Sequence, residues 1–270
     1  MSPILIRTFR VRKRHVAALV ALVFIAFYQA RLYEARAACQ VVEAMAWSVA
    51  SRVIVVDPGH GGYDPGMVGK DGVLEKDITL AVGRSLADCL GQAGAMVLLT
   101  RETDTDLSDP ATAGPAAKKR EDLARRVNLA NKNQADLYLS VHVNSYPSPD
   151  CRGAQTFFQP GSAGSKMAAG YIQSELARLL KNTSRKPVEV DYFITRNAAM
   201  PAVIVEIGFM TNEAEAKLLQ DPDYQGKVAW AIYAGVVKCF AQMSDSAGEN
   251  PEKEKVIKTF RESETKIYRP

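Results

Sequence analysis

The chain has 270 residues, of which 47% are hydrophobic, and its formal net charge is +4. This composition can bury a full core and excludes a chain that is disordered as a whole. Residues 1–37 carry seven Lys or Arg side chains and one Glu, which leaves a net charge of −2 on the remainder. The basic balance is therefore a property of the leader and gives no reason to expect nucleic-acid binding.

The N-terminal segment has the pattern of an export signal. Five cationic residues between positions 7 and 14 precede an apolar run of 13 residues, 16–28. This run is short for a membrane span and suits a signal-peptide core, and small residues at 35–38 offer a cleavage site. We expect residues 1–37 to be a signal peptide or an N-terminal membrane anchor. The protein would then be secreted, or anchored on the outer side of the cytoplasmic membrane.

Strand and helix patterns alternate from residue 52 to residue 243. Apolar runs predict strands at 53–57, 95–100, 137–143, 154–159, 188–195 and 202–207. Helical periodicity fills 78–90, 123–130 and 168–179, and a last helix is predicted at 227–240. The alternation predicts an α/β fold, with a mostly parallel, twisted sheet of about six strands and helices on both faces, in a single domain at 38–243. The charged segment 244–270 is expected to be disordered or a loosely formed helix.

Two histidines follow predicted strands at equivalent places. His60 lies in a glycine-rich turn after the first strand, and His142 closes the strand that begins at Leu137. Functional sites in such sheets gather at the carboxyl ends of strands. A lone histidine at a strand end is more often structural, but these two are the only histidines outside the leader. Their equivalent positions favour a functional role.

Two glutamates extend this pattern. Glu206 directly follows the apolar run 202–205, and a carboxylate there is costly unless it is paired or binds a metal. Pairing with Arg126, or capping of a helix, is the structural alternative. Two histidines and one glutamate form a known catalytic zinc set, and a further glutamate can serve as base. The second glutamate is Glu75, which opens a segment with helical periodicity. Spacing alone leaves Asp57 and Asp64 as competitors of Glu75 for the role of carboxylate ligand.

Several motifs follow one another in order between residues 52 and 240. They are DPGHGGYDPG, Glu75-Lys76 with Asp77, Thr100-Arg101 with Asp104, Arg126 with Ala130-Asn131, SVHVN, and RNAAMPAVIVEIGFMTN. Together these motifs resemble the zinc-dependent N-acetylmuramoyl-L-alanine amidases. The single domain and short leader are most similar to the small sporulation and germination type, which acts on spore cortex.

This resemblance implies one zinc ion per chain, held by His60, Glu75 and His142, with Glu206 as the catalytic carboxylate. The implied reaction is hydrolysis of the amide bond between the lactyl group of N-acetylmuramic acid and L-alanine of the stem peptide, in spore cortex maturation or germination. By proximity in sequence, Asp57, Asn144 and Arg126 are candidates to orient the imidazoles, although holding turns and strand ends is an equal alternative.

The expected partners are peptidoglycan and an activating lipoprotein or other regulatory protein, with N-terminal membrane association and no nucleic acid. Two alternatives stay open at this point. One is a zinc carboxypeptidase or another peptidoglycan amide hydrolase with a similar sheet. The other is an inactive wall-binding protein of the same fold.

Overall fold

The structure is a computed structural model, and it describes residues 13–246. The beginning of the predicted leader, residues 1–12, and most of the predicted charged tail, residues 247–270, lie outside the described residues. The chain divides into two units, residues 1–44 and residues 45–270.

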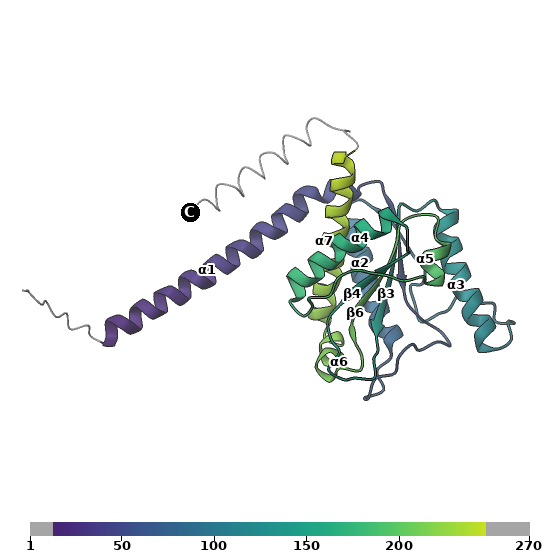
Figure 1. Cartoon of the computed structure of the whole chain (residues 1–270), viewed down its shortest axis with the longest axis horizontal. Helices are drawn as coiled ribbons and strands as arrows, with labels where there is room; N and C mark the ends of the chain where they lie inside the picture. Colours follow the sequence, from purple (N-terminus) through teal and green to yellow (C-terminus); the bar gives the residue numbers. More distant parts are fainter. Residues whose placement is uncertain (1–12, 247–270) are drawn as a thin grey trace, which may run out of the picture. The chain divides into compact units, whose positions relative to one another are not determined.

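The first unit contains the long helix α1, Lys13–Met45, which is coloured purple in Figure 1. Many of its apolar side chains are exposed, among them Leu19 and Phe24, whereas Val42 near its end is buried. Among the described residues, no helix is both long and apolar enough to cross a membrane. The helix runs without a break through residue 37, where the leader was predicted to end. The leader boundary therefore stays a prediction.

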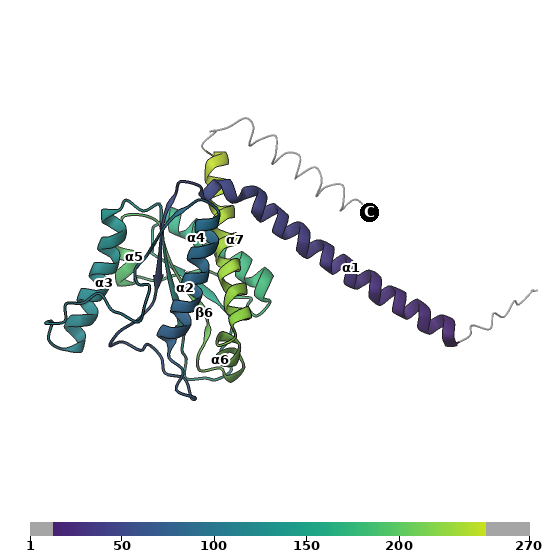
Figure 2. The same cartoon turned by 180° about the vertical axis from the view of Figure 1, so that it is seen from behind.

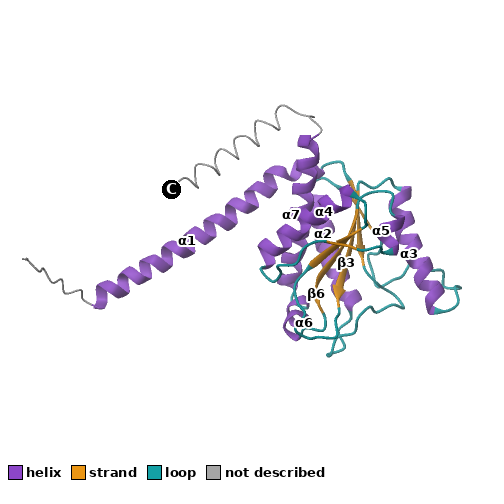
Figure 3. Ribbon diagram, in the orientation of Figure 1, coloured by secondary structure: helices purple, strands orange, loops and turns teal. Residues whose placement is uncertain are grey.

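The second unit is built on a six-stranded sheet, drawn in orange in Figure 3. Its strands have the order β2-β1-β3-β6-β4-β5, and every neighbouring pair is parallel except β4 and β6. This topology confirms the predicted fold class. The strands are β1 (Val53–Pro58), β2 (Met96–Leu99), β3 (Leu137–Asn144), β4 (Gln155–Phe158), β5 (Val188–Glu189) and β6 (Ala202–Phe209).

Helices cover both faces of the sheet, as predicted (Figures 1 and 2). The helices α2 (Glu75–Gln92), α4 (Ala163–Leu180) and α7 (Pro222–Ser246) pack on one face. The opposite face carries α3 (Pro115–Lys132) and the short α5 (Phe193–Asn197). The remaining elements are α6 (Glu213–Leu219) and the 3₁₀ helix Ala46–Val49.

The face under α3 and α5 fixes where the site lies. Val55 of β1, Tyr138 of β3 and Ala202 of β6 pack there against Val127 of α3 and Ile194 of α5. Because side chains alternate along a strand, every second residue from these positions points to the same face. Nearer the carboxyl ends, these positions include Asp57, His142 and Glu206. The helices cover the apolar beginnings of the strands, and the polar residues follow at the carboxyl edge.

One predicted strand is wrong over most of its length, and the short helices α5 and α6 were not predicted. The run 188–195 is a strand only at Val188–Glu189, and the chain then turns into α5. Aromatic and β-branched residues favour a strand at 192–195. The helical turn instead buries Ile194 in the core, and Asn131 receives a hydrogen bond from the backbone N–H of Ala199 at 2.9 Å, just after the helix. Tertiary packing therefore overrides local propensity. The unpredicted helix α6 begins after Asn212, whose side chain accepts a hydrogen bond from the N–H of Glu215.

Candidate metal centre

The turn after β1 is held in an unusual backbone conformation. His60 has φ of +64°, and the next two glycines also have positive φ. Two buried arginines fix this turn through its carbonyl oxygens. Arg126 donates to the carbonyls of Pro58 and His60 at 2.9 and 2.7 Å, and Arg101 donates to those of Pro58 and Gly59 at 3.0 Å each. The strained conformation at His60 is therefore set by the protein scaffold.

Two glycines allow the groups of the site to approach one another. A Cβ atom on Gly59 would lie 2.3 to 2.6 Å from ring atoms of His142. A Cβ atom on Gly66 would lie 2.6 Å from Oε2 of Glu75 and 2.8 Å from Cδ2 of His60. No real side chain fits at such distances. Glycine at both positions is a packing requirement of this site.

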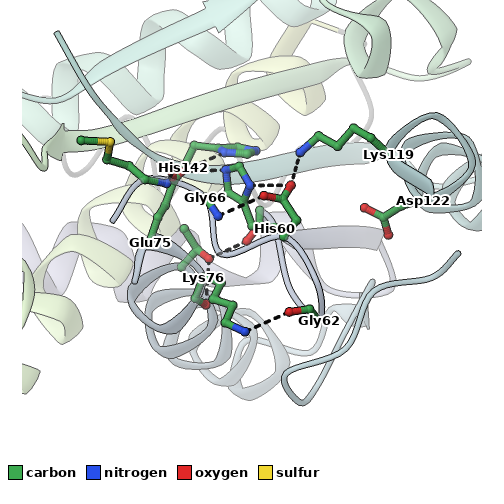
Figure 4. Close-up of polar contacts among 12 residues, drawn as sticks. His60, Gly62, Gly66, Glu75, Lys76, Lys119, Asp122 and His142 are labelled. Carbon is green, nitrogen blue, oxygen red and sulfur yellow. Dashed lines mark hydrogen bonds and ion pairs between the residues drawn. The ribbon is translucent and has the colours of Figure 1, made fainter. Parts of the chain in front are cut away.

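Two imidazoles and one carboxylate converge at the carboxyl edge of the sheet (Figure 4). Nε2 of His60 and Nδ1 of His142 each lie 3.1 Å from Oε1 of Glu75. The two rings meet edge to face, with centroids 4.9 Å apart. One ligand atom from each of the three residues lies within 4.8 Å of the others, so the group could hold a metal ion. The structure thus brings together the three residues considered as ligands from the sequence.

Glu75 is the first residue of α2 and is almost fully buried. Its Oε2 accepts a hydrogen bond from the N–H of Met67 at 2.8 Å, and its Oε1 accepts one from the N–H of Val143 at 2.9 Å. Burial opposes ionisation, but hydrogen bonds from His142 and His60 outweigh it and hold the pKa of Glu75 well below its usual range. The carboxylate is therefore charged and fixed in place.

Asp64, a competitor of Glu75 in the sequence, takes a different position. Its Oδ2 lies 2.9 Å from Nδ1 of His60, and its Oδ1 accepts the N–H of Gly66 at 3.0 Å. Lys119 of α3 forms an ion pair with the same carboxylate and reaches across in Figure 4. Burial disfavours the charged imidazole, but hydrogen bonds with Asp64 and Glu75 prevail and raise the pKa of His60 to about 9. Asp64 therefore orients the ring of His60 from the side away from Glu75.

The residues expected to orient the imidazoles have structural roles instead. Asp57 is fully buried, forms an ion pair with Arg126 at 2.8 Å and accepts hydrogen bonds from Thr100 and Ser140 at 2.6 and 2.7 Å. The backbone carbonyl of Asn144 accepts a hydrogen bond from the N–H of Met210. Among the hydrogen bonds of the described residues, none joins these groups to an imidazole nitrogen. The sequence offered Asp64 only as a competing ligand, and it gave no signal for the pairing of Asp64 with Lys119 of α3.

Glu206 lies directly opposite His142, where β6 pairs with β3. Its Oε2 is buried and has no hydrogen-bond partner among the residues that the structure describes. The alternative pairing with Arg126 does not occur, because Arg126 bonds to Asp57 and Asp122. Burial raises the pKa of Glu206 to about 7. This carboxyl group can therefore hold or release a proton near neutral pH, and a buried carboxylate without a partner fits a metal ion and a reacting water close by.

The donor set defines a class of protein. Two imidazoles and a carboxylate beside a second carboxylate with a raised pKa are the donors of a metal-dependent hydrolase. The comparison with known families identifies which one. Residues 54–238 match the sequence profile of the N-acetylmuramoyl-L-alanine amidases of the Amidase_3 type, and the chain belongs to this family. The family match identifies an N-acetylmuramoyl-L-alanine amidase and does not support the carboxypeptidase alternative.

Individual relatives agree with this assignment. The chain is 44% identical over 202 residues to the germination-specific N-acetylmuramoyl-L-alanine amidase of Bacillus subtilis, a match that covers 74% of this chain and 85% of the relative. Among solved structures, it is similar to the CwlD amidase of Clostridioides difficile in complex with the GerS lipoprotein, with 37% identity, a TM-score of 0.68 and coverage of 70% and 98%. A second N-acetylmuramoyl-L-alanine amidase of Clostridium difficile 630 gives 31% identity and a TM-score of 0.63, with coverage of 70% and 96%.

Proposed function

We propose that this protein hydrolyses the amide bond between the lactyl group of N-acetylmuramic acid and L-alanine of the stem peptide, with one zinc ion held by His60, Glu75 and His142. The observation that carries the metal assignment is the convergence of these three residues, whose ligand atoms lie within 4.8 Å of one another. A nitrogen, nitrogen and oxygen donor set suits zinc.

Glu206 is the catalytic carboxylate in this proposal. A zinc ion held by the three ligands supplies Lewis-acid polarisation of the amide carbonyl and a more acidic water. Oε2 of Glu206 takes the proton from the attacking water and then gives it to the departing amine of alanine. Both steps are accessible because burial raises the pKa of this group to about 7. Asp64 keeps the ring of His60 aligned throughout, and Arg101 and Arg126 hold the turn that carries it.

Product analysis tests the reaction, the metal and the base together. Purified full-length protein is incubated with peptidoglycan, and the products are identified by mass spectrometry. We expect intact stem peptides with a free alanine amine, loss of activity with a chelator and recovery on addition of zinc. Glu206→Gln should keep zinc and lower the rate by about 10²- to 10⁴-fold. An active Glu206→Gln enzyme contradicts the assigned base, and wall binding without released peptide favours the inactive wall-binding alternative.

The proposed biological substrate is the peptidoglycan of spore cortex, during maturation or germination. The germination-specific relative from Bacillus subtilis supports this proposal, because its match spans most of both chains. The direct test compares digestion of purified spore cortex with digestion of vegetative wall. Faster release of peptide from vegetative wall would contradict the proposal.

An activating lipoprotein is the proposed protein partner. The support is the solved relative whose structure is of a complex with a lipoprotein. If the proposal holds, a co-expressed lipoprotein from the same cell raises the activity of the chain above that of the isolated chain. Full activity of the isolated chain would remove the need for such a partner.

Export, by secretion or by anchoring outside the cytoplasmic membrane, is the proposed localisation. The basic residues before the apolar run, the exposed apolar side chains of α1 and a substrate outside the cytoplasm support it. Fractionation with N-terminal sequencing distinguishes a cleaved leader from a retained anchor. Recovery of the intact chain in the cytosol would contradict both.

A further inference from the structure

A second group of polar residues lies along the same sheet edge, one strand beyond Glu206. Glu206 is paired with His142 of β3 on one side and with Gln155 of the antiparallel strand β4 on the other. Residues directly opposite on neighbouring strands point to the same face and lie about 5 Å apart. His142, Glu206 and Gln155 therefore form a row across three strands, which leads away from the metal ligands.

Arg185 continues this row. Its Nη1 donates to Oε1 of Gln155 at 3.3 Å, its Nε donates to the carbonyl of Arg152 at 3.1 Å, and its guanidinium lies 4.9 Å from the ring centre of Phe209. These contacts anchor Arg185 at the end of β6, the strand that carries Glu206. Arg185 also lines a cavity of about 620 Å³, so the row of residues leads from Glu206 to this cavity.

The cavity is lined by residues 150–152 and 181–185, and we name it the basic pocket. Its charged lining residues are Arg152, Lys181, Arg185 and one acid, Asp150. Within the part of the chain that the structure describes, the side chains of Arg152 and Lys181 take part in no ion pair. The lining therefore has an excess of positive charge.

Two neighbouring features reduce this charge without cancelling it. The helix α4 ends at Leu180 with Lys181 as its C-cap, and a helix C-terminus carries about half a negative charge. Next to the residues that line the basic pocket, the carboxylate of Glu215 already accepts hydrogen bonds from the N–H groups of Gly153 and Phe209 and from the side chain of Asn182. The cations at the surface are left to attract an anion from solution.

We propose that the basic pocket binds the terminal carboxylate of the stem peptide, and so selects uncapped peptides for cleavage. This inference rests on the proposed amidase function. A peptide joined to muramic acid through its amino end has a free carboxylate at its other end unless it is capped or cross-linked. Three extended residues span at most about 11 Å, about twice the spacing between neighbouring strands, so a peptide cleaved beside Glu206 can extend past Gln155.

The test uses two soluble substrates that differ only at the far end. Both are N-acetylmuramoyl tripeptides that begin with L-alanine, one with a C-terminal carboxylate and one with a C-terminal carboxamide. The test variant is Arg152→Gln with Lys181→Gln, because neither side chain forms a hydrogen bond or ion pair with the other residues that the structure describes. The control, Lys132→Gln with Lys166→Gln, removes the same charge at the ends of α3 and α4 nearest the opposite sheet edge.

For zinc-loaded full-length protein, we expect wild type to prefer the carboxylate substrate about tenfold in kcat/KM, mainly through KM. The test variant should lose this preference and cleave the carboxamide as wild type does, and the control should behave as wild type. Equal cleavage of both substrates by wild type overturns the inference. So does an equal loss on both substrates in the test variant, or no loss on either. If wild type breaks the lactyl–alanine bond in neither substrate, with the lipoprotein present as well as without it, the proposed function itself fails.

Discussion

Asp64 offers the sharpest test of how the fold tunes the candidate metal centre. Asp64→Asn keeps the size of the side chain and removes its charge. The hydrogen bond from Nδ1 of His60 then reaches a neutral oxygen, and Lys119 loses its ionic partner. Removal of a carboxylate that orients a metal-binding histidine typically costs about 10- to 100-fold in metal affinity. We expect the zinc Kd to rise by this factor, which corresponds to about 1.4 to 2.8 kcal/mol.

The same variant changes how the stability of the metal-free protein depends on pH. The pKa of His60 is raised from 6.5 to about 9, so its charged form stabilises the fold. That contribution is fully present below pH 6.5 and is lost as the pH rises through about 9. Without the charge of Asp64, the pKa of His60 moves back toward its ordinary value. The loss of stability between these pH values should therefore be smaller in Asp64→Asn.

Two measurements check this prediction. Zinc affinity is measured by competition with a chromophoric chelator, and unfolding of the chelator-treated protein is followed by circular dichroism across the pH range. The matched control is Asp109→Asn, an exposed carboxylate on the loop before α3 that does not contact His60. At saturating zinc, Asp64→Asn should regain most of its activity. If its zinc affinity and pH profile equal those of wild type, the role argued for Asp64 is refuted.

Two further substitutions have matched controls. Arg126→Met leaves buried carboxylates without their cation and should lower the free energy of unfolding by about 3 to 5 kcal/mol. The control Arg125→Met, on the same helix, breaks an exposed ion pair and should lower the free energy of unfolding by under about 1 kcal/mol. Chemical denaturation measures both free energies of unfolding. Equal losses in the two variants would contradict the role of Arg126 as the partner of the buried carboxylates. Gly59→Ala puts a methyl group 2.3 Å from the ring of His142, so zinc binding should fall sharply, while Gly91→Ala meets nothing within 4 Å and should leave it unchanged. Isothermal titration with zinc checks this pair, and tight binding by Gly59→Ala would show that the ring moves without cost.

The sequence predicted the sheet and the places of the site residues because both depend on local pattern. Long apolar runs that end abruptly in polar residues mark buried parallel strands, and such ends meet at one edge. His142 and Glu206 were therefore expected at the same edge, and the structure places them directly opposite each other. Glu75 was harder, since it begins a helix and its position depends on a glycine-rich loop whose path no periodicity describes.

The remaining differences arise from contacts between distant segments. The segment that ends at Asn197 has the residue types of a strand, but the burial of Ile194 and its neighbouring hydrogen bonds to Asn131 select a helix. Asp64 and Lys119 are 55 residues apart, so their pairing depends on how α3 packs on the sheet. Neither contact leaves a signal in one short window of sequence.

The antiparallel direction of β4 has a consequence for how such enzymes diversify. The parallel strands β1, β3 and β6 end at the edge of the sheet that carries the candidate metal centre, whereas the antiparallel strand β4 begins there. The loop 145–154 before β4 and the segment 181–187 before β5 therefore both lie at this edge. Neither segment contributes a residue to the three candidate metal ligands or to the two buried arginines that hold the turn after β1. If the basic pocket selects the peptide as proposed above, insertions and charge changes in these two segments alter which wall polymers are accepted and leave the metal ligands in place. Selectivity and chemistry would then be physically separable parts of this molecule.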